Sequence, residues 1–498
     1  MPPRQPDATL PPGITRVLDE PLLGLYAGAD FIAAPRGTAA PEAVRWYFQD
    51  EPTAVPAPGV TAAGDSPELD ARADVRAWYA QADEQALAAR PSLLWLAGSH
   101  LAGEVRLTAD GSAIAGAGSA PVPFRIADRI PSNRSFYNAD SARFFAGRSL
   151  RIRGGLEPLP DGPARFVGRA LWPQEYRLPE AARPLPPAAH ETPMDLVRGA
   201  PAGPSAAYSV RLLWERRPGA GARWADRPAL GIVLNGAQGD DDDALGGHFA
   251  VATGRAGPGG EWSHWVTSNF YSLETFSEKG IIAAMVPMDS YLMDVNSGQS
   301  WYRPSYVLAV LLNRERVALA LQSAVSRVFQ HFYRQDLRYD NATANCAGIT
   351  LDTLGALGWT APALGPTSYA RGLAAMLVTA ARERSLALGR RSFRYFTAER
   401  THLLPALAFE ATAIHLMHLL GAAQPRRAPA GRFERWLSED VEAIAFVHVP
   451  QLPSSRVCGG TPAASIDEYL SRTPRRRSQW KTIALAPRPL PPGLPRRR

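Results

Sequence analysis

The sequence predicts an α+β fold, because strand-like and helix-like stretches occupy different parts of the chain. Short apolar runs separated by Gly, Asp and Pro fill the first 200 residues, and apolar positions recur at helical spacing beyond residue 315. With 498 residues, 46% hydrophobic and 20% charged, the composition is that of an ordinary globular protein. This length has room for about two to four folded domains.

Turn-rich and proline-rich segments divide the chain into three expected regions. Residues 1–195 are expected to form a β-rich N-terminal domain, with runs such as EVRLTADG and RSLRIRGG. A proline-dense linker from Arg177 to Pro193 ends this domain. Residues 205–360 are expected to form a central domain, and residues 361–498 a mainly helical C-terminal region with a basic tail.

The central domain is expected to combine strands with one long helix. AYSVRLLWERR and ALGIVLNG are predicted strands, and GGHFAVATG with HWVTSNFY is a predicted hairpin. Apolar positions from Val317 to Phe332 have helical spacing behind Asn313, which is the predicted N-cap. Two further helices are expected, from about Ser368 to Arg384 and from Pro405 to Gly421.

The distribution of charge and the number of cysteines exclude some classes of function. The net charge is +7, and arginine runs at 475–477 and 496–498 supply part of it. No aromatic-interleaved basic face accompanies these runs, so a solvated tail is favoured and nucleic acid is not an expected partner. The two cysteines, Cys346 and Cys458, are too few for a disulfide framework or a multi-cysteine zinc site. No cofactor and no metal are expected.

Neither a secretory signal nor a membrane span is predicted. The start, MPPRQPDATLPPG, lacks a basic segment, an apolar core and a cleavage site. The longest apolar stretch, Leu403 to Gly421, contains Pro405, Glu410 and two histidines, which are costly at the centre of a bilayer. It predicts a buried or surface-lying helix, and the compartment stays open, with peripheral membrane contact among the expected partners.

Cys346 is the first candidate for chemistry. It lies in NATANCAGITLDTLGALGW, where a loop is expected to pass into a short helix that starts at Ala347. A thiol at a helix N-terminus gains from the helix dipole and from free backbone N–H groups, which lower its pKa and can bind an oxyanion. A small buried core cysteine is the alternative, and local context alone weighs the two equally.

His248 is the candidate base for this thiol. It follows two glycines and opens an apolar strand, where backbone can approach a substrate closely. A structural role is the alternative for a histidine taken alone. The next strand offers His264, Ser268 and Asn269 to orient the imidazole, and His264 is selected. The register of the hairpin is open, since a slip of one residue turns every side chain to the other face.

The order of these features resembles the Lnb N-terminal periplasmic domain family, a permuted relative of NlpC-type peptidases and lecithin:retinol acyltransferase-like proteins. The Gly-Gly-His strand, SWYRPSYVLAVLLNRERVALAL and YDNATANCAGITLDTL carry the resemblance, which spans Ala229 to Trp359. It implies a permuted papain-like domain in which Cys346 is the nucleophile, His248 is the general base and an acyl-enzyme forms. It also implies an envelope-associated or periplasmic location.

A cysteine enzyme with catalytic residues Cys346, His248, His264 and Asn345 is the resulting prediction. Asn345 or the Ala347 backbone is expected to assist the oxyanion. The resemblance implies acyl transfer from a lipid or lipoprotein to an amine or other acceptor, with amide hydrolysis on cell-wall peptides as the alternative. A catalytically silent binding scaffold is the rival class. A redox sensor, with Cys458 as the resolving thiol, is a third.

Three other motifs favour structural roles. Asp240 to Asp243 are expected in a solvated turn, because adjacent carboxylates rarely converge on one cation. His415 and His418 are spaced i and i+3, whereas the zinc-protease pattern needs i and i+4. RAGPGG lacks the Lys and Ser or Thr of a phosphate loop and is expected to be a hairpin tip.

Overall fold

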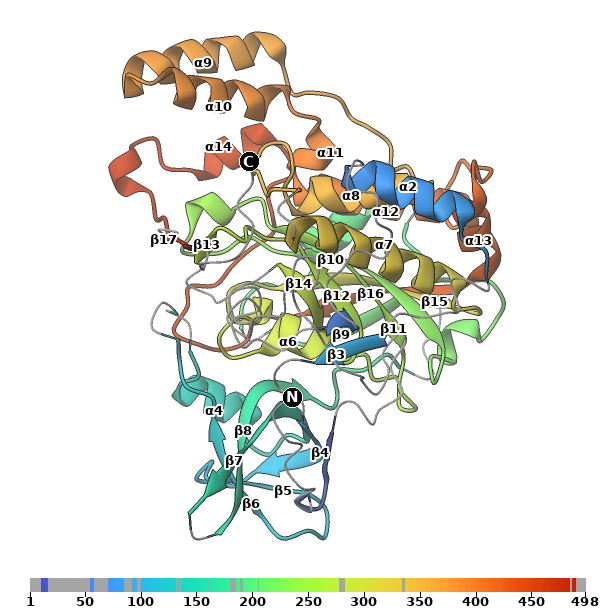
Figure 1. Cartoon of the computed structure of the whole chain (residues 1–498), viewed down its shortest axis with the longest axis vertical. Helices are drawn as coiled ribbons and strands as arrows, with labels where there is room; N and C mark the ends of the chain where they lie inside the picture. Colours follow the sequence, from blue (N-terminus) through green and yellow to red (C-terminus); the bar gives the residue numbers. More distant parts are fainter. Residues whose placement is uncertain are drawn as a thin grey trace.

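A computed structural model gives the fold of most of the chain. It describes residues 10–16, 54–57, 70–84, 92–95, 100–130, 133, 136–160, 162–179, 185–188, 191–204, 206–276, 283–333, 336–483 and 486–489. Helices and sheets are both present, as expected for an α+β protein. A small barrel lies at one end of the molecule, and a large sheet with its helices makes up the rest (Figure 1).

A nine-stranded sheet forms the centre of the protein, and all of its neighbouring strands run antiparallel. In spatial order its strands are β3 (Ser92–Trp95), β2 (Ala54–Ala57), β14 (Ala284–Pro287), β12 (Val266–Asn269), β11 (His248–Arg255), β10 (Pro228–Asn235), β15 (Ser305–Leu312), β16 (Val441–Val449) and β9 (Ser209–Glu215). The expected hairpin is confirmed, since β11 pairs with β12.

The middle strands of this sheet are buried along their whole length and mostly apolar, because both faces are covered. Every residue of β10, β15 and β16 is buried, which is the pattern of strands packed on two sides. On one face lie the helices α7 (Arg316–Tyr333), α8 (Cys346–Leu357) and α12 (Pro405–Leu420), with α2 (Ala71–Gln81) and α13 (Arg432–Asp440) outside them (Figure 1). The other face meets α6 (Met288–Met293), which contacts the barrel.

The small barrel is built from six strands of the N-terminal region. Its strands are β1 (Ile14–Arg16), β4 (His100–Leu107), β5 (Ala113–Ala115), β6 (Val122–Ile126), β7 (Leu150–Leu159) and β8 (Gly162–Pro173), with α4 (Ala139–Phe145) between β6 and β7. The order β4-β5-β6-β8-β7 closes on itself because β7 also pairs with β4. The β6–β8 pair is parallel and the others are antiparallel. Five of the strands therefore close into a Greek-key barrel with the topology of an OB-fold, and β1 pairs with β4 beside them.

The remaining helices and strands are short or lie outside the two sheets. They are α5 (Pro193–Gly199), α9 (Tyr369–Glu383), α10 (Leu386–Thr397), α11 (Arg400–Leu403), α14 (Ile466–Arg472), the pair β13 (Thr275–Phe276) and β17 (Ala486–Pro487), and the 3₁₀ turns η3 (Ala220–Ala222), η4 (Asp242–Ala244), η5 (Gln299–Trp301) and η6 (Arg477–Gln479). Helices α9 and α12 match the two helices expected after residue 361.

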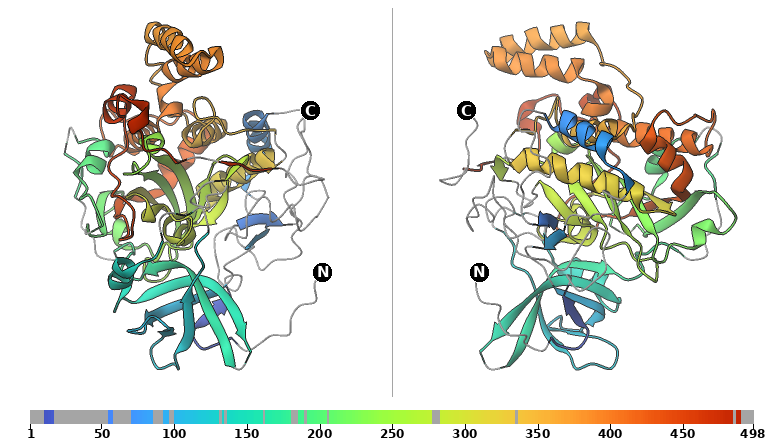
Figure 2. Two further views of the ribbon diagram at one scale, coloured as in Figure 1. Left: turned by 90° about the vertical axis from the view of Figure 1, so that its left-hand side faces the viewer. Right: turned by 45° about the vertical axis from the view of Figure 1, so that its right-hand side comes forward.

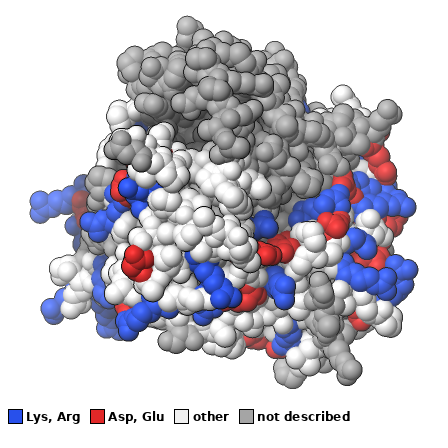
Figure 3. All heavy atoms as spheres, turned by 90° about the horizontal axis from the view of Figure 1, so that it is seen from below, with Lys and Arg blue, Asp and Glu red and all other residues white. Residues whose placement is uncertain are grey.

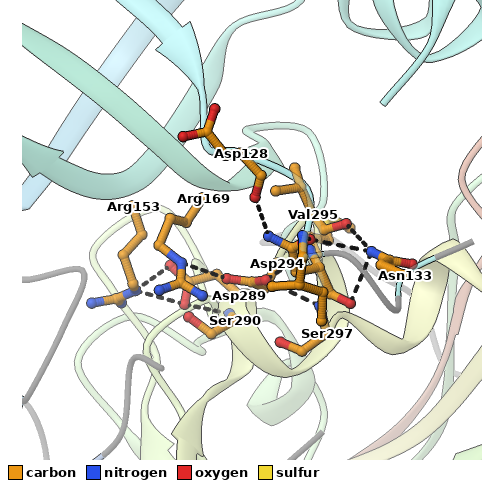
Figure 4. Close-up of polar contacts among 12 residues, drawn as sticks. Asp128, Asn133, Arg153, Arg169, Asp289, Ser290, Asp294, Val295 and Ser297 are labelled. Atoms are coloured by element: carbon orange, nitrogen blue, oxygen red, sulfur yellow. Dashed lines mark hydrogen bonds and ion pairs between the residues drawn. The ribbon is translucent and has the colours of Figure 1, made fainter. Parts of the chain in front are cut away.

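A buried polar interface joins the barrel to the sheet (Figure 4). Arg153 of β7 donates from Nε to both carboxylate oxygens of Asp289 in α6, each at 2.9 Å, and both side chains are 0% exposed. Arg169 of β8 donates to Asp294 at 3.1 Å. Asn296 accepts a hydrogen bond from the Ile130 backbone at 2.9 Å. These contacts fix the orientation of the barrel against the sheet.

Residues 1–195 build more than the expected β-rich domain. Strands β2 and β3 extend the edge of the central sheet, and α2 packs on α7 and α8. Within α2, Asp74 accepts a hydrogen bond from Arg327 at 2.7 Å and lies 3.2 Å from the His331 ring. Burial disfavours the carboxylate, but the His331 and Arg327 contacts outweigh it and lower the pKa of Asp74. The N-terminal region is therefore shared between the barrel and the central layer.

Two expected boundaries differ from the structure. The long helix begins at Arg316, and the expected N-cap, Asn313, instead donates to Glu442 at 3.4 Å. The C-terminal region is mainly helical but supplies β16, a buried strand between β15 and β9. In the part of the chain that the structure describes, no helix is both long and apolar enough to cross a membrane.

Loss of Asp289 is expected to destabilise the protein strongly. Asp289→Ala leaves the Arg153 guanidinium buried without its carboxylate, which costs about 3–5 kcal/mol. Urea unfolding followed by fluorescence measures the change. The exposed pair of Arg143 and Asp140 is the control, and Asp140→Ala should leave unfolding nearly unchanged. Equal effects of the two substitutions would contradict the assignment of Asp289 as the main interface contact.

Candidate active site

Cys346 lies at a helix N-terminus, as expected from the sequence, and α8 begins at Cys346, one residue before the expected start at Ala347. The preceding Asn345 caps the helix, and its side-chain oxygen accepts from the backbone N–H groups of Ala347 at 2.9 Å and Gly348 at 3.0 Å. Its amide nitrogen donates to the backbone oxygens of Asn341 at 3.1 Å and Leu403 at 2.9 Å. The cap therefore fixes the start of α8 and the position of the thiol.

Polar groups near the Cys346 sulfur favour its thiolate. They are the backbone N–H groups of Phe249 and Ala347 and the hydroxyl of Tyr339, and the positive charge of Arg303 acts in the same direction on the pKa of the thiol. The residue is only 3% exposed. Phe249 is the second residue of β11, so the thiol lies at the end of the strand that His248 begins.

His248 stands at a point where the backbone is tightly packed. Gly247 before it has φ +79°, and a Cβ atom there would lie 2.4 Å from the Asn235 backbone oxygen. Only glycine fits this approach. His248 pairs with Asn235 in the sheet, and Asn235 pairs with Ser305 on its other side. Directly paired residues share a face, so these three polar side chains form one row.

The row around His248 continues into Tyr291. The Tyr291 ring centroid lies 6.4 Å from that of His248, and the Tyr291 hydroxyl donates to the side-chain oxygen of Asn235. Asn235 in turn donates to Ser305 at 2.8 Å. Tyr291 also interacts electrostatically with Cys346. The structure therefore brings His248 and Cys346 to the same end of β11, with Tyr291 beside both.

Arg303 is a buried cation in this site that sequence reasoning missed. It is 4% exposed and donates to the Gln299 side-chain oxygen at 2.7 and 3.0 Å and to the Gly236 backbone oxygen at 3.1 Å. Among the described residues, no carboxylate forms an ion pair with it. Burial lowers the pKa of Arg303, and the negative forms of Tyr291 and Cys346 oppose this effect. The sequence signal was an arginine inside the otherwise apolar segment SWYRPSYVLAV.

Burial controls the acidity of Cys346. It raises the pKa of the thiol above its usual value, and the donors from Phe249 and Tyr339 and the charge of Arg303 only partly offset the effect. The expectation of a lowered pKa at a helix N-terminus was wrong for this state, because desolvation of the thiolate exceeds the stabilisation by nearby donors. The thiol is therefore protonated at neutral pH, and it would need a base to act as a nucleophile.

His264 lies away from this pair. In the hairpin Val266 faces Thr253, and His248 is five residues from Thr253 along β11, a distance of about 17 Å. His264 lies beyond Val266 in the opposite direction. Its ring contacts Arg151, and Arg153 at 3.0 Å, in the interface with the barrel. His264 therefore cannot orient His248, and its expected catalytic role is corrected to an interface role.

Asn345 also has a different role from the one expected. Its oxygen and both of its amide hydrogens are used in holding the start of α8, so no amide donor is left to bind an oxyanion. The polar groups that act on the sulfur are the expected Ala347 backbone N–H, the Phe249 N–H and the Tyr339 hydroxyl. Sequence reasoning missed Phe249 and Tyr339, because only the packing of β11 and of the 336–345 loop on α8 places them there.

The other sequence motifs are engaged in local structure. Asp240 pairs with Arg456 at 2.8 Å, and Asp242 accepts from the Lys481 backbone at 2.8 Å. His415 accepts from the Trp359 indole at 2.9 Å. In the described part of the chain, no three His, Cys, Asp or Glu residues gather as metal ligands. Cys346 and Cys458 are free thiols, the first buried and the second exposed.

The barrel end of the molecule carries both signs of charge. Seen from below, Lys and Arg side chains are interspersed with Asp and Glu (Figure 3). Arg125, for example, contacts Glu157 at 3.0 Å and Asp128 at 3.1 Å. Phosphate binding by nucleic-acid proteins uses a surface of one sign. The mixed charges on the described part of this face do not form one.

Removal of the Asn345 cap is expected to loosen α8. Asn345→Ala deletes the acceptor for two helix N–H groups and the donor to Leu403, which should lower the free energy of unfolding by about 1–2 kcal/mol. Asn345→Ser keeps a capping oxygen and should lose less. Urea unfolding of the two variants measures the difference. Identical stability of Asn345→Ala and wild type would contradict the capping role.

The rate at which Cys346 is alkylated in the folded protein is expected to rise only at high pH, because the pKa of its thiol is raised. Iodoacetamide reacts with the thiolate. The pH at which the alkylation rate is half-maximal should therefore be higher for the folded chain than for the urea-unfolded chain, because burial raises the pKa of the thiol. Tyr339→Phe removes a donor to the sulfur and should move the midpoint further upward. Mass spectrometry resolves Cys346 from Cys458. A folded midpoint below the unfolded one would contradict this assignment.

Comparison with known proteins adds no relative, since no family model, curated protein or solved structure matches this chain. The chemistry of the site must therefore be inferred from its own residues.

Proposed function

We propose that the protein is a cysteine enzyme that forms a thioester on Cys346, with His248 as the general base. The observation that carries the proposal is the position of the sulfur. It lies at the first turn of α8, at the end of the strand that His248 begins, where the Phe249 N–H and the Tyr339 hydroxyl favour its thiolate form. His248 opens the strand at this same end, and the proposal is that it acts as the base for the thiol there.

The reaction begins when the Cys346 sulfur attacks the carbonyl carbon of an acyl donor. The thiol proton passes to the His248 imidazole, which then gives it to the leaving oxygen or nitrogen as that bond breaks. An acceptor amine or hydroxyl next attacks the thioester carbon and gives its proton to His248, which passes it to the Cys346 thiolate as the carbon–sulfur bond breaks. The Phe249 N–H and the Tyr339 hydroxyl stabilise the oxyanion in both steps, and the nearby charge of Arg303 favours each anionic state.

The central sheet with α7 and α8 serves, in this proposal, as a permuted papain-like domain. The base precedes the nucleophile in sequence, a strand carries the base, and a helix begins at the nucleophile. Transfer from a lipid donor to an amine or another acceptor is the preferred reaction. Its support is an exposed apolar and basic helical hairpin, α9 and α10, linked to the site through α11. Hydrolysis of cell-wall peptides is the alternative reaction, and a screen of lipid and peptide donors would distinguish it from lipid acyl transfer.

Trapping of an acyl-enzyme tests the proposal. Incubation with a short-chain thioester or p-nitrophenyl ester, followed by acid quench and intact mass measurement, should show one hydroxylamine-sensitive adduct on Cys346. Cys346→Ala should abolish it, and Cys458→Ala should not. His248→Ala should slow its formation by about 10²- to 10⁴-fold, the usual contribution of a general base.

His418→Ala is the control for a histidine outside the site, since this side chain lies half-buried on α12. It should leave the acylation rate unchanged. If Cys458 is acylated as fast as Cys346, or if His248→Ala behaves like His418→Ala, the enzyme proposal fails and a binding scaffold is favoured. Competition between phospholipid and peptide donors then decides the substrate class of an active enzyme.

A further inference from the structure

A helical hairpin projects from the body of the protein. Helices α9 and α10 pack on each other and extend beyond the sheet and its covering helices in all views (Figures 1 and 2). Gly372 lets α10 approach closely, since a Cβ there would lie 3.2 Å from Phe393 and Phe396. Gly389 does the same against Ala380, at 2.9 Å. The hairpin is thus a compact unit whose outer sides face solvent.

Large apolar side chains are exposed along this hairpin. Tyr369, Leu373 and Leu377 are 65%, 50% and 59% exposed and follow one another at four-residue spacing, so they form one stripe on α9. Val378 is 63% exposed, and Leu386 at the start of α10 is 73% exposed. Scattered apolar residues are normal on a protein surface, but a contiguous group of this kind marks an interaction site.

The same hairpin is strongly basic. Residues 369–397 contain six arginines and one glutamate, a net charge of +5. Arg371 pairs with Asp467 and Arg394 contacts Asp340 at 3.5 Å. Arg384, Arg390 and Arg391 are exposed, and none of them forms an ion pair with a carboxylate among the described residues. Unpaired arginines therefore lie on the same unit as the exposed apolar residues.

We propose that the α9–α10 hairpin docks the protein on the surface of an anionic lipid bilayer. The leucines and Tyr369 enter the boundary between headgroups and acyl chains, where buried apolar area supplies affinity. The arginines bind lipid phosphates, and each adds to the attraction toward a negatively charged leaflet. Arginine suits this contact because its planar guanidinium can bind phosphate with two hydrogen bonds.

The charge of the α9–α10 hairpin favours a bilayer over a second copy of the chain as its binding partner. Two hairpins of net charge +5 would repel each other when their apolar stripes met, because like charges at a contact are unfavourable. An anionic surface is complementary to both features of the hairpin. The lipid surface is therefore the occupant that accounts for the apolar stripe and the arginines together.

Docking through this hairpin would place the bilayer near the candidate active site. Helix α11 follows α10 directly, and the backbone oxygen of Leu403 at its end accepts the hydrogen bond from Asn345, the residue before Cys346. A lipid donor could then reach the thiol without leaving the surface. This link to the substrate rests on the proposed function, whereas membrane binding does not.

Sedimentation with vesicles tests the proposal. The full chain should bind 1:1 phosphatidylglycerol–phosphatidylcholine vesicles at least tenfold more tightly than pure phosphatidylcholine vesicles, and salt should weaken this binding. Leu377→Ser with Leu386→Ser should weaken it at least tenfold through lost apolar burial. Arg390→Glu with Arg391→Glu should weaken it at least tenfold on anionic vesicles only.

Matched controls lie elsewhere on the surface. Leu185 is 62% exposed and Arg129 is exposed in the barrel domain, so Leu185→Ser and Arg129→Glu should leave vesicle binding unchanged. Circular dichroism confirms that each variant is folded. Equal vesicle binding by hairpin and control variants would overturn the proposal. The absence of vesicle binding by the wild type would also overturn the proposal. In that case, a dimer of the wild type that Leu377→Ser dissociates would identify a second copy of the chain as the partner of the hairpin.

Acylation by a water-soluble ester separates the two proposals. That reaction needs Cys346 and His248 but not a membrane, so hairpin variants should keep its rate. Loss of vesicle binding with intact acylation would be a result about the hairpin alone. Vesicle binding without acylation would leave docking established and remove only the enzyme.

Discussion

The capping interaction of Asn345 is the constraint on which the candidate site depends. One side-chain amide uses its oxygen to begin α8 and its nitrogen to hold the 341 loop and α11. The helix start cannot shift without breaking these bonds, so the Cys346 thiol is held against the end of β11. Gly247 completes the arrangement from the sheet side, because only glycine fits beside the Asn235 carbonyl.

Burial and charge act in opposite directions at Cys346. Removal of the thiol from water raises its pKa, and backbone and hydroxyl donors lower it by less. Arg303 supplies a buried positive charge beside the sulfur, held in place by Gln299 and a backbone oxygen. The balance of these effects leaves the thiol of the free protein protonated at neutral pH.

The central sheet and its covering helices are built from segments that lie far apart in the sequence. The first 100 residues give α2 and two edge strands to the central sheet, and β16 comes from the C-terminal region. The barrel then attaches through the buried Arg153–Asp289 pair. Such an ion pair contributes little net stability compared with apolar packing, but it strongly disfavours any arrangement that leaves one partner alone. This interface therefore sets the orientation of the barrel against the central sheet more than it adds to the stability of the protein.

Local pattern was enough to predict the α+β class, the hairpin that starts at His248, and helices within one or two residues of the observed bounds of α8, α9 and α12. Periodicity, glycine and capping residues encode these features within a few residues of one another. The roles of His264 and Asn345, the presence of Arg303, and the sharing of the N-terminal region were decided by tertiary structure. Strand register and long-range packing set which side chains meet, and a one-residue slip changes every contact, so no local pattern contains that information.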